Sequence, residues 1–238
     1  MMPDQSYIGQ ELEIFARAVN WKRYFSDHIR PFIGSKVLEV GAGIGATTEI
    51  LAPQECSEWV CLEPDSHLLS VIEGKIQQGT LPNFCRPVQG TLHQLPVSEK
   101  FDTILYIDVL EHIENDYDEL NTASQRLSPG GKLVVLSPAH DFLFSNFDKA
   151  IGHFRRYNRQ MIRSATPPEL ELISNKYLDA VGALTSLANK LLLGQKNPTL
   201  EQIYFWDHWL VPMSKVVDKL TGHNFGRSII GIWKKPDG

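Results

Sequence analysis

Three glycines are spaced along the segment VLEVGAGIGATTEIL, from Val37 to Leu51, where an apolar run gives way to a helix-like run. Gly41, Gly43 and Gly45 would let backbone N–H groups approach a ligand at a helix N-terminus, where an anionic group is favoured. A triphosphate-binding loop is excluded, because no Gly-Lys-Ser/Thr ending follows. A dinucleotide stays open, because Gly41, Gly43 and Ala46 satisfy G-x-G-x-x-A.

Two acids flank this loop and narrow the choice of ligand. Glu39 lies inside the first apolar run, where a buried carboxylate needs a partner such as a ligand ammonium. Glu63 ends the next apolar run, at the distance expected of an acid that binds a ribose. The polar sequence YIDVLEHI, residues 106–113, ends a further strand at the edge where α/β proteins bind ligands. Together these residues favour an adenosine ligand that also carries an amino acid group.

The sequence predicts alternating strands and helices, which place these residues at the ends of strands. Strands are predicted at 36–40, 58–63, 83–92, 101–108 and 130–138, the third weakened by Pro87, with helices between them. This order predicts a parallel sheet covered by helices on both faces. A sixth strand at 170–180, a long helical stretch over 182–220 and a last strand at 226–235 follow. The last strand is expected to run antiparallel.

Composition bounds the function. The chain has 238 residues and a formal charge of -5, which argues against a nucleic-acid or membrane-surface partner. Cys56, Cys61 and Cys85 form no metal-like pair, which indicates reduced thiols in a cytoplasmic protein. No signal peptide and no membrane span is predicted.

The sequence resembles the class I S-adenosylmethionine-dependent methyltransferases. The motifs that carry this resemblance are VLEVGAGIGATTEIL, CLEPD, FDTILYIDVLEHIEND and LSPGGKLVVLSPA, in that order. A later block, GHFRRY, is similar to one found in a bacterial subgroup of these enzymes. The resemblance implies a doubly wound, seven-stranded, mostly parallel Rossmann-like sheet with the last strand antiparallel. It divides the chain into N-terminal helices (1–35) and a methyltransferase domain (36–238), with a helical cap at about 141–163 and 182–227.

The resemblance also implies roles for individual residues towards S-adenosylmethionine. Glu39 supports the methionine ammonium, Glu63 accepts both ribose hydroxyls, and Pro64 packs on the adenine. The glycine loop wraps the methionine portion, Thr91 and Leu92 flank the adenine, and Asp108 and Val109 border the methionine end; the loop residues are Gly41, Ala42, Gly43 and Gly45. An ordinary turn residue is the alternative for Thr91.

Histidines near the methionine end are candidates for acid–base catalysis. His112, His140 and His153 could accept a proton from a methyl acceptor near neutral pH. Packing against the cofactor is the alternative for His112. Asp108, Glu111 and His112 could also gather a divalent ion, but the spacing is generic and no metal site is predicted.

The block GHFRRYNR, residues 152–159, is predicted to cover the cleft. Arg155 and Arg156, followed by Tyr157, could form a fork for a carboxylate or phosphate, so an anionic small-molecule acceptor is predicted. Salt bridges to local acids such as Asp148 are the alternative. The aromatic stretch YFWDHWLVP, residues 204–212, could line an acceptor pocket, form a homodimer face or complete the core of the cap.

The resulting prediction is an enzyme that methylates oxygen or nitrogen of a small molecule by in-line transfer. The alternatives are a non-catalytic S-adenosylmethionine-binding partner protein, an RNA or protein methyltransferase, and, more remotely, an NAD-dependent oxidoreductase.

Overall fold

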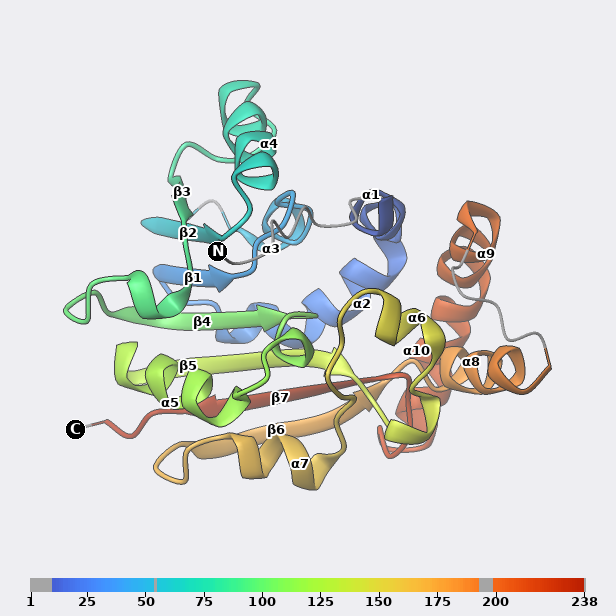
Figure 1. Cartoon of the computed structure of the whole chain (residues 1–238). Helices are drawn as coiled ribbons and strands as arrows, with labels where there is room; N and C mark the ends of the chain where they lie inside the picture. The colour runs from blue at the N-terminus through green and yellow to red at the C-terminus, as the bar shows by residue number, and fades with distance from the viewer. Residues whose placement is uncertain (1–9, 54, 193–198, 238) are drawn as a thin grey trace.

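A seven-stranded sheet forms the centre of the computed structural model, which describes residues 10–53, 55–192 and 199–237 (Figure 1). The strands are β1 (Lys36–Val40), β2 (Glu58–Glu63), β3 (Cys85–Gln89), β4 (Phe101–Ile107), β5 (Leu127–Pro138), β6 (Glu171–Leu178) and β7 (Ser228–Lys234). Their order across the sheet is β3-β2-β1-β4-β5-β7-β6.

Only β7 runs against its neighbours: it pairs antiparallel with both β5 and β6, and the other pairs are parallel. The predicted fold class is therefore confirmed, including the antiparallel last strand. Pro87 lies in β3, at the edge of the sheet, where a residue without a backbone N–H can be tolerated.

Helices cover both faces and one end of this sheet (Figure 1). The α-helices are α1 (Gln10–Ala16), α2 (Val19–Ile29), α3 (Thr48–Leu51), α4 (Ser66–Gln77), α5 (Asp116–Arg126), α6 (Asn146–Ala150), α7 (Arg159–Ala165), α8 (Ala180–Leu192), α9 (Leu200–Phe205) and α10 (Val211–Leu220). Five short helices complete the list: 3-10 helices η1 (Arg30–Phe32), η2 (Leu92–Gln94), η3 (Leu110–His112) and η4 (Asp141–Leu143), and π-helix η5 (Trp206–Leu210).

Alternate residues of each strand point to opposite faces of the sheet, so they contribute to two separate hydrophobic cores. Val37 of β1 packs with Phe25 of α2 in one cluster, and Leu38 packs with Leu120 of α5 in the other. Both clusters are closed to solvent. Each stabilises the fold by roughly 1.5–3 kcal/mol for every large side chain that it buries.

The cap lies at the carboxyl ends of β1, β4 and β5, where α6, α8, α9 and α10 gather with the N-terminal helices (Figure 1). The single helical stretch predicted over 182–220 is wrong. A new helix, α9, starts after Thr199, whose side chain accepts a hydrogen bond from the Gln202 N–H in a capping box. Part of the predicted cap, residues 193–198, lies outside the described residues, as does the start of the predicted N-terminal helices.

The cap is tied to the N-terminal helix α2 by one buried acid. Asp207 of η5 accepts hydrogen bonds from the backbone N–H groups of Asn20 and Trp21, at 3.1 and 2.8 Å. These are N–H groups at the start of α2, which has no side-chain cap of its own. The Trp21 and Trp206 rings pack with their centroids 5.8 Å apart. Residues 187 positions apart in the sequence thus meet where the cap joins α2.

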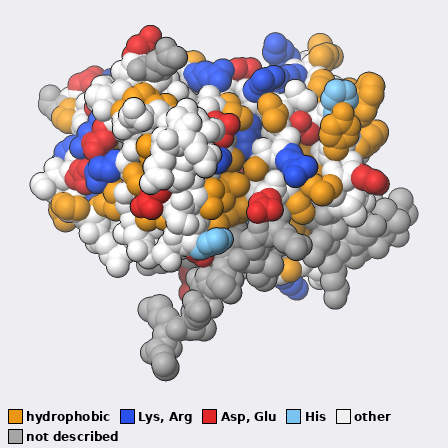
Figure 2. All heavy atoms as spheres, turned by 90° about the horizontal axis from the view of Figure 1, so that it is seen from above, with side chains coloured by type: hydrophobic (Ala, Val, Ile, Leu, Met, Phe, Trp, Pro, Cys, Tyr) orange, Lys and Arg blue, Asp and Glu red, His pale blue; other side chains and the backbone are white. Residues whose placement is uncertain are grey.

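The aromatic stretch of the cap divides between core and surface. Trp206 and Ile203 are buried, whereas Tyr204, Phe205 and Trp209 are more than half exposed. Figure 2 shows hydrophobic side chains gathered at the end of the molecule where α9 lies. Among the described residues, no helix has both the length and the apolar character that crossing a bilayer requires.

Candidate cofactor and acceptor site

The glycine loop turns sharply between β1 and α3. Gly41, Gly43 and Gly45 have φ values of +66°, +55° and +73°, which other residues adopt only with strain. A Cβ atom on Gly41 would lie 2.6 Å from the Cγ2 atom of Val109, so this turn also requires a close approach of two loops. The loop is held to β2, because the N–H groups of Gly41 and Ala42 both donate to the Leu62 carbonyl.

Glu63 faces this loop from the end of β2. One of its carboxylate oxygens accepts a hydrogen bond from the Gly43 N–H at 2.8 Å, and the other accepts from the Asp65 N–H at 3.0 Å. Burial raises the pKa of Glu63, and these two hydrogen bonds oppose the shift. The carboxylate is therefore held in one orientation beside the loop, as a bidentate acceptor for a ribose requires.

Glu39 lies below the loop on the opposite side of β1 from Leu38. It is 2% exposed, and one carboxylate oxygen accepts hydrogen bonds from the Thr48 hydroxyl at 2.6 Å and from the Trp59 indole at 2.8 Å. Burial raises the pKa of Glu39 to about 7, against the effect of these two hydrogen bonds. A buried acid that titrates near neutrality would be stabilised in its charged form by a nearby cation.

Charged groups from three elements meet at the methionine end of the predicted site. Asp108 follows β4 with φ +55° and is solvent-accessible, while Val109 covers Gly41. The surrounding protein still deprives Asp108 of hydration, which raises its pKa to about 6 against the charges of His153 and Arg227.

Lys22 of α2 is a buried cation near Asp108 that sequence reasoning missed. Its ammonium donates a hydrogen bond to the Phe15 carbonyl. Burial lowers the pKa of Lys22 to about 8, and the charges of Asp108 and Asp207 oppose the shift. Since α2 precedes the motif region, only the fold reveals that this lysine lies near Asp108.

Three residues were predicted to contact the adenine: Pro64, Thr91 and Leu92. Pro64 is exposed and open to a stacking ligand. Thr91 caps η2 through a capping box, with its N–H donating to the Gln94 side chain at 2.8 Å, and this agrees with the turn-residue alternative. Leu92 is wholly buried in the core. Contacts of these three residues with adenine stay predictions.

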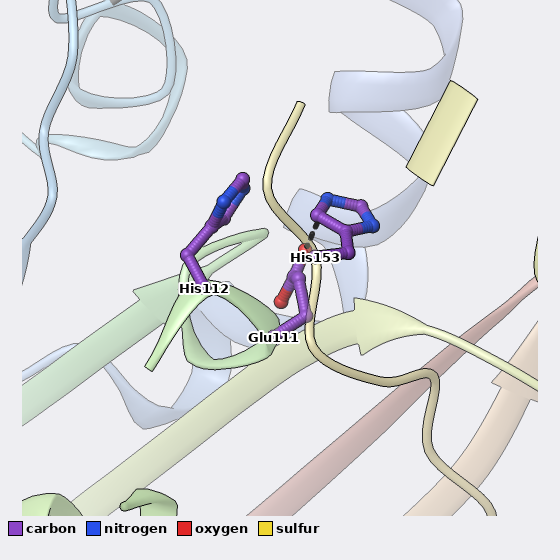
Figure 3. A group of neighbouring side chains, drawn as sticks. All are labelled: Glu111, His112 and His153. Carbon is purple, nitrogen blue, oxygen red and sulfur yellow. Dashed lines mark ion pairs between the residues drawn. The ribbon is translucent and has the colours of Figure 1, made fainter. Parts of the chain in front are cut away.

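Glu111, His112 and His153 form a cluster beyond the end of β4. Figure 3 shows Glu111 and His112 on the turn that follows this strand, with His153 on the segment that crosses over it. One ligand atom from each side chain lies within 4.8 Å of the other two. The His112 and His153 rings meet edge to face, 4.5 Å between centroids. Burial first, and then the charge of His153, lowers the pKa of His112 to about 4.

Asp148 of α6 orients the His153 ring of this cluster through a hydrogen bond. Its carboxylate pairs with His153 Nδ1 at 2.9 Å and with two nitrogens of Arg156 at 2.8 and 3.1 Å. Burial would raise the pKa of Asp148, but the hydrogen bonds from His153 and Arg156 outweigh it and hold the pKa well below its usual range. His153 Nε2 is thereby left facing Glu111, 3.8 Å from Oε1.

Both arginines of the GHFRRY block have partners within the chain. Arg156 is 8% exposed and forms the bidentate pair with Asp148, whereas Arg155 pairs with Asp116 at 2.6 Å. Tyr157 is 1% exposed and donates its hydroxyl hydrogen to the same Asp116 carboxylate at 2.7 Å. The structure therefore agrees with the salt-bridge alternative for both arginines rather than with a free anion fork, because each guanidinium already neutralises an acid.

His140 lies apart from this cluster. Its ring packs with the rings of Tyr177, Phe142 and Phe225, at centroid distances of 4.5, 5.0 and 5.3 Å. Burial, and then the charge of Arg156, lowers its pKa. Of the three predicted catalytic histidines, the structure thus brings His112 and His153 together and places His140 in an aromatic stack.

Residues 38–135 match the family described as "Methyltransferase domain". Among curated proteins, the chain is 29% identical over 132 residues to a demethylmenaquinone methyltransferase of Tropheryma whipplei (strain Twist), a match that covers 53% of this chain and 51% of that protein. It is 31% identical over 117 residues to a ubiquinone biosynthesis O-methyltransferase of Paramagnetospirillum magneticum, covering 46% of each. The chain thus spans about half the length of these relatives.

Solved structures extend the likeness to the fold of the whole chain. A geranyl diphosphate methyltransferase in complex with SAM superposes with a TM-score of 0.64, covering 98% of this chain and 93% of that one. Its sequence identity is 11%, so this likeness establishes the fold alone.

Proposed function

We propose that this chain, whose residues 38–135 match a methyltransferase domain, is an S-adenosylmethionine-dependent enzyme that methylates oxygen or nitrogen of a small molecule bound under the cap. The observation that carries the proposal is the rigid pairing of Glu63 with the glycine loop, with Glu39 unsatisfied by any described cation beneath it. The cofactor, when bound, supplies a methyl group on a positively charged sulfur, which needs no further activation.

The residues present fit this cofactor. Gly41 lets the glycine loop turn closely against Val109, and Glu63 would offer two oriented oxygens to the ribose hydroxyls. Glu39 would hold the methionine ammonium, and Lys22 would oppose the methionine carboxylate. Pro64 would pack on the adenine.

The chain's own part in the reaction is chiefly alignment and the exclusion of water. The cap would place the acceptor atom in line with the sulfur–methyl bond. A hydroxyl acceptor must also lose a proton, and His112 would receive it, because the lowered pKa of His112 keeps its imidazole neutral. The likeness to a ubiquinone biosynthesis O-methyltransferase supports an oxygen acceptor as the first to be tried.

The test has two steps. Calorimetric titration with S-adenosylhomocysteine measures cofactor binding, and transfer of a labelled methyl group to a panel of phenols, catechols and amines measures turnover. Binding together with transfer supports the proposal. Binding without transfer to any acceptor would favour the non-catalytic partner protein, and the absence of binding would overturn both.

A further inference from the structure

We propose that Glu111, His112 and His153 bind one divalent transition-metal ion beside the acceptor position. Both the ligand types and their placement support such a site. Two imidazoles and one carboxylate, with further positions open, are a ligand set used for Zn²⁺ in hydrolases and for Fe²⁺ in oxygenases. The inference rests on the proposed function only for the role of the ion, since ion binding can be measured by itself.

Glu111 is the residue that most needs a partner. It is fully buried, and no described group makes a hydrogen bond of good geometry to either carboxylate oxygen; its polar neighbours are the Ser137 hydroxyl and His153 Nε2, the latter 3.8 Å from Oε1. A buried carboxyl without partners costs several kcal/mol if it is charged. A bound cation would supply the missing partner.

His153 is oriented as metal-binding histidines usually are. Its Nδ1 is paired with Asp148, which in turn is held by Arg156, so Nε2 is fixed towards Glu111. A carboxylate behind the histidine sets the tautomer and the ring plane in most such sites. The distance of 3.8 Å between Nε2 and Oε1 is close to that expected for two ligands of one metal ion. Two ligand atoms each about 2.1 Å from a tetrahedral ion are roughly 3.4 Å apart.

His112 supplies the third ligand from the residue after Glu111. The cluster's ligand atoms lie within 4.8 Å of one another, so a small rotation of the His112 ring would bring its nitrogen into range. A neutral imidazole is the form that binds metal.

The ion would act on the acceptor through its open coordination positions. A hydroxyl oxygen bound there becomes more acidic, as water does on zinc, and its proton leaves to solvent. The oxygen then attacks the methyl carbon; a carbon–oxygen bond forms, the carbon–sulfur bond breaks, and its electron pair stays on sulfur. The ion keeps its oxidation state throughout. In this arrangement His112 binds the ion instead of receiving the proton.

Metal binding can be tested on the untagged full chain after dialysis against a chelator. We expect calorimetry to show one Zn²⁺ site per chain, and Co²⁺ to give the visible absorption bands of a nitrogen- and oxygen-bound ion. Glu111→Gln and His153→Ala should each weaken binding by more than about 100-fold, beyond the 10–100-fold typical of outer-shell changes. His67→Ala, on an exposed histidine of α4, is the matched control and should leave affinity unchanged.

The two proposals fail in different ways. Absence of Zn²⁺ and Co²⁺ binding in the wild type, or equal binding by the wild type, Glu111→Gln and His153→Ala, would overturn the metal site. S-adenosylhomocysteine titrated in the presence of a chelator reports on the cofactor site alone. Glu111→Gln keeps the size of the side chain and removes only its charge, and circular dichroism confirms that the variant is folded.

Discussion

The glycine loop and the cap meet at the same edge of the sheet, but they are built in different ways. In the loop, Gly41, Gly43 and Glu63 belong to one strand–helix–strand unit, and the contacts join backbone N–H groups to an acid about twenty residues away. In the cap, the contacts join distant parts of the chain, as the Asp207 side chain does by accepting hydrogen bonds from the backbone N–H groups of Asn20 and Trp21. Backbone geometry set by local sequence thus forms the proposed cofactor site, whereas long-range contacts form the proposed acceptor side.

The largest expected effect that separates the two regions comes from Asp148→Ala. This change leaves Arg156 buried without its partner, so the free energy of unfolding should fall by about 3–5 kcal/mol. Urea unfolding followed by circular dichroism measures it. Asp141→Ala, on an exposed acid nearby, should change stability by less than about 0.5 kcal/mol. An equally small effect of Asp148→Ala would show that the cap does not depend on this pair.

This contrast explains how much could be predicted from the sequence. The strands of the sheet and the loop with Glu63 follow from local patterns, because hydrophobic periodicity and glycine spacing reflect the backbone directly. The partner of Arg155 could not be found in this way, since Asp116 lies far along the chain and only the fold brings it close. The same holds for Lys22. Thr199 and Gln202 form a capping-box pattern that marks the start of α9. The prediction of one helical stretch relied on the helical periodicity and did not use this pattern.

The second prediction concerns the cofactor side. Glu63→Ala should weaken S-adenosylhomocysteine binding by about 1.5–3 kcal/mol, roughly 10- to 150-fold, because two charge-assisted hydrogen bonds to the ribose are lost. Calorimetry measures the change, with Glu73→Ala on an exposed position of α4 as the control. Affinity within a factor of two of the wild type would contradict the ribose role.

The third prediction uses pH. Because burial raises the pKa of Glu39 to about 7, its carboxyl is mostly protonated below that pH and cannot pair with an ammonium. Affinity for S-adenosylhomocysteine should therefore fall as the pH is lowered from 7 to 6, approaching about tenfold per pH unit below that. Glu39→Gln should bind more weakly and lose this dependence. A pH profile that is the same for both proteins would exclude Glu39 from ammonium binding.

The smallest expected effect is that of Arg155→Ala. The Arg155–Asp116 pair is partly exposed, so its loss should cost no more than about 1 kcal/mol of stability and leave cofactor affinity unchanged. Thermal unfolding and the same titration measure both quantities. A more than tenfold rise in the KM for the acceptor, with stability unchanged, would instead indicate that Arg155 contacts the acceptor. That result would support the anion-binding role predicted from the sequence.

The most direct test of the central claim compares two ligands on the wild-type chain. Calorimetric titration with S-adenosylhomocysteine should give saturable binding to one site per chain, and NAD should give none, since Glu39 and Lys22 suit the two charges of an amino acid. Saturable binding of NAD in preference to S-adenosylhomocysteine would contradict the account.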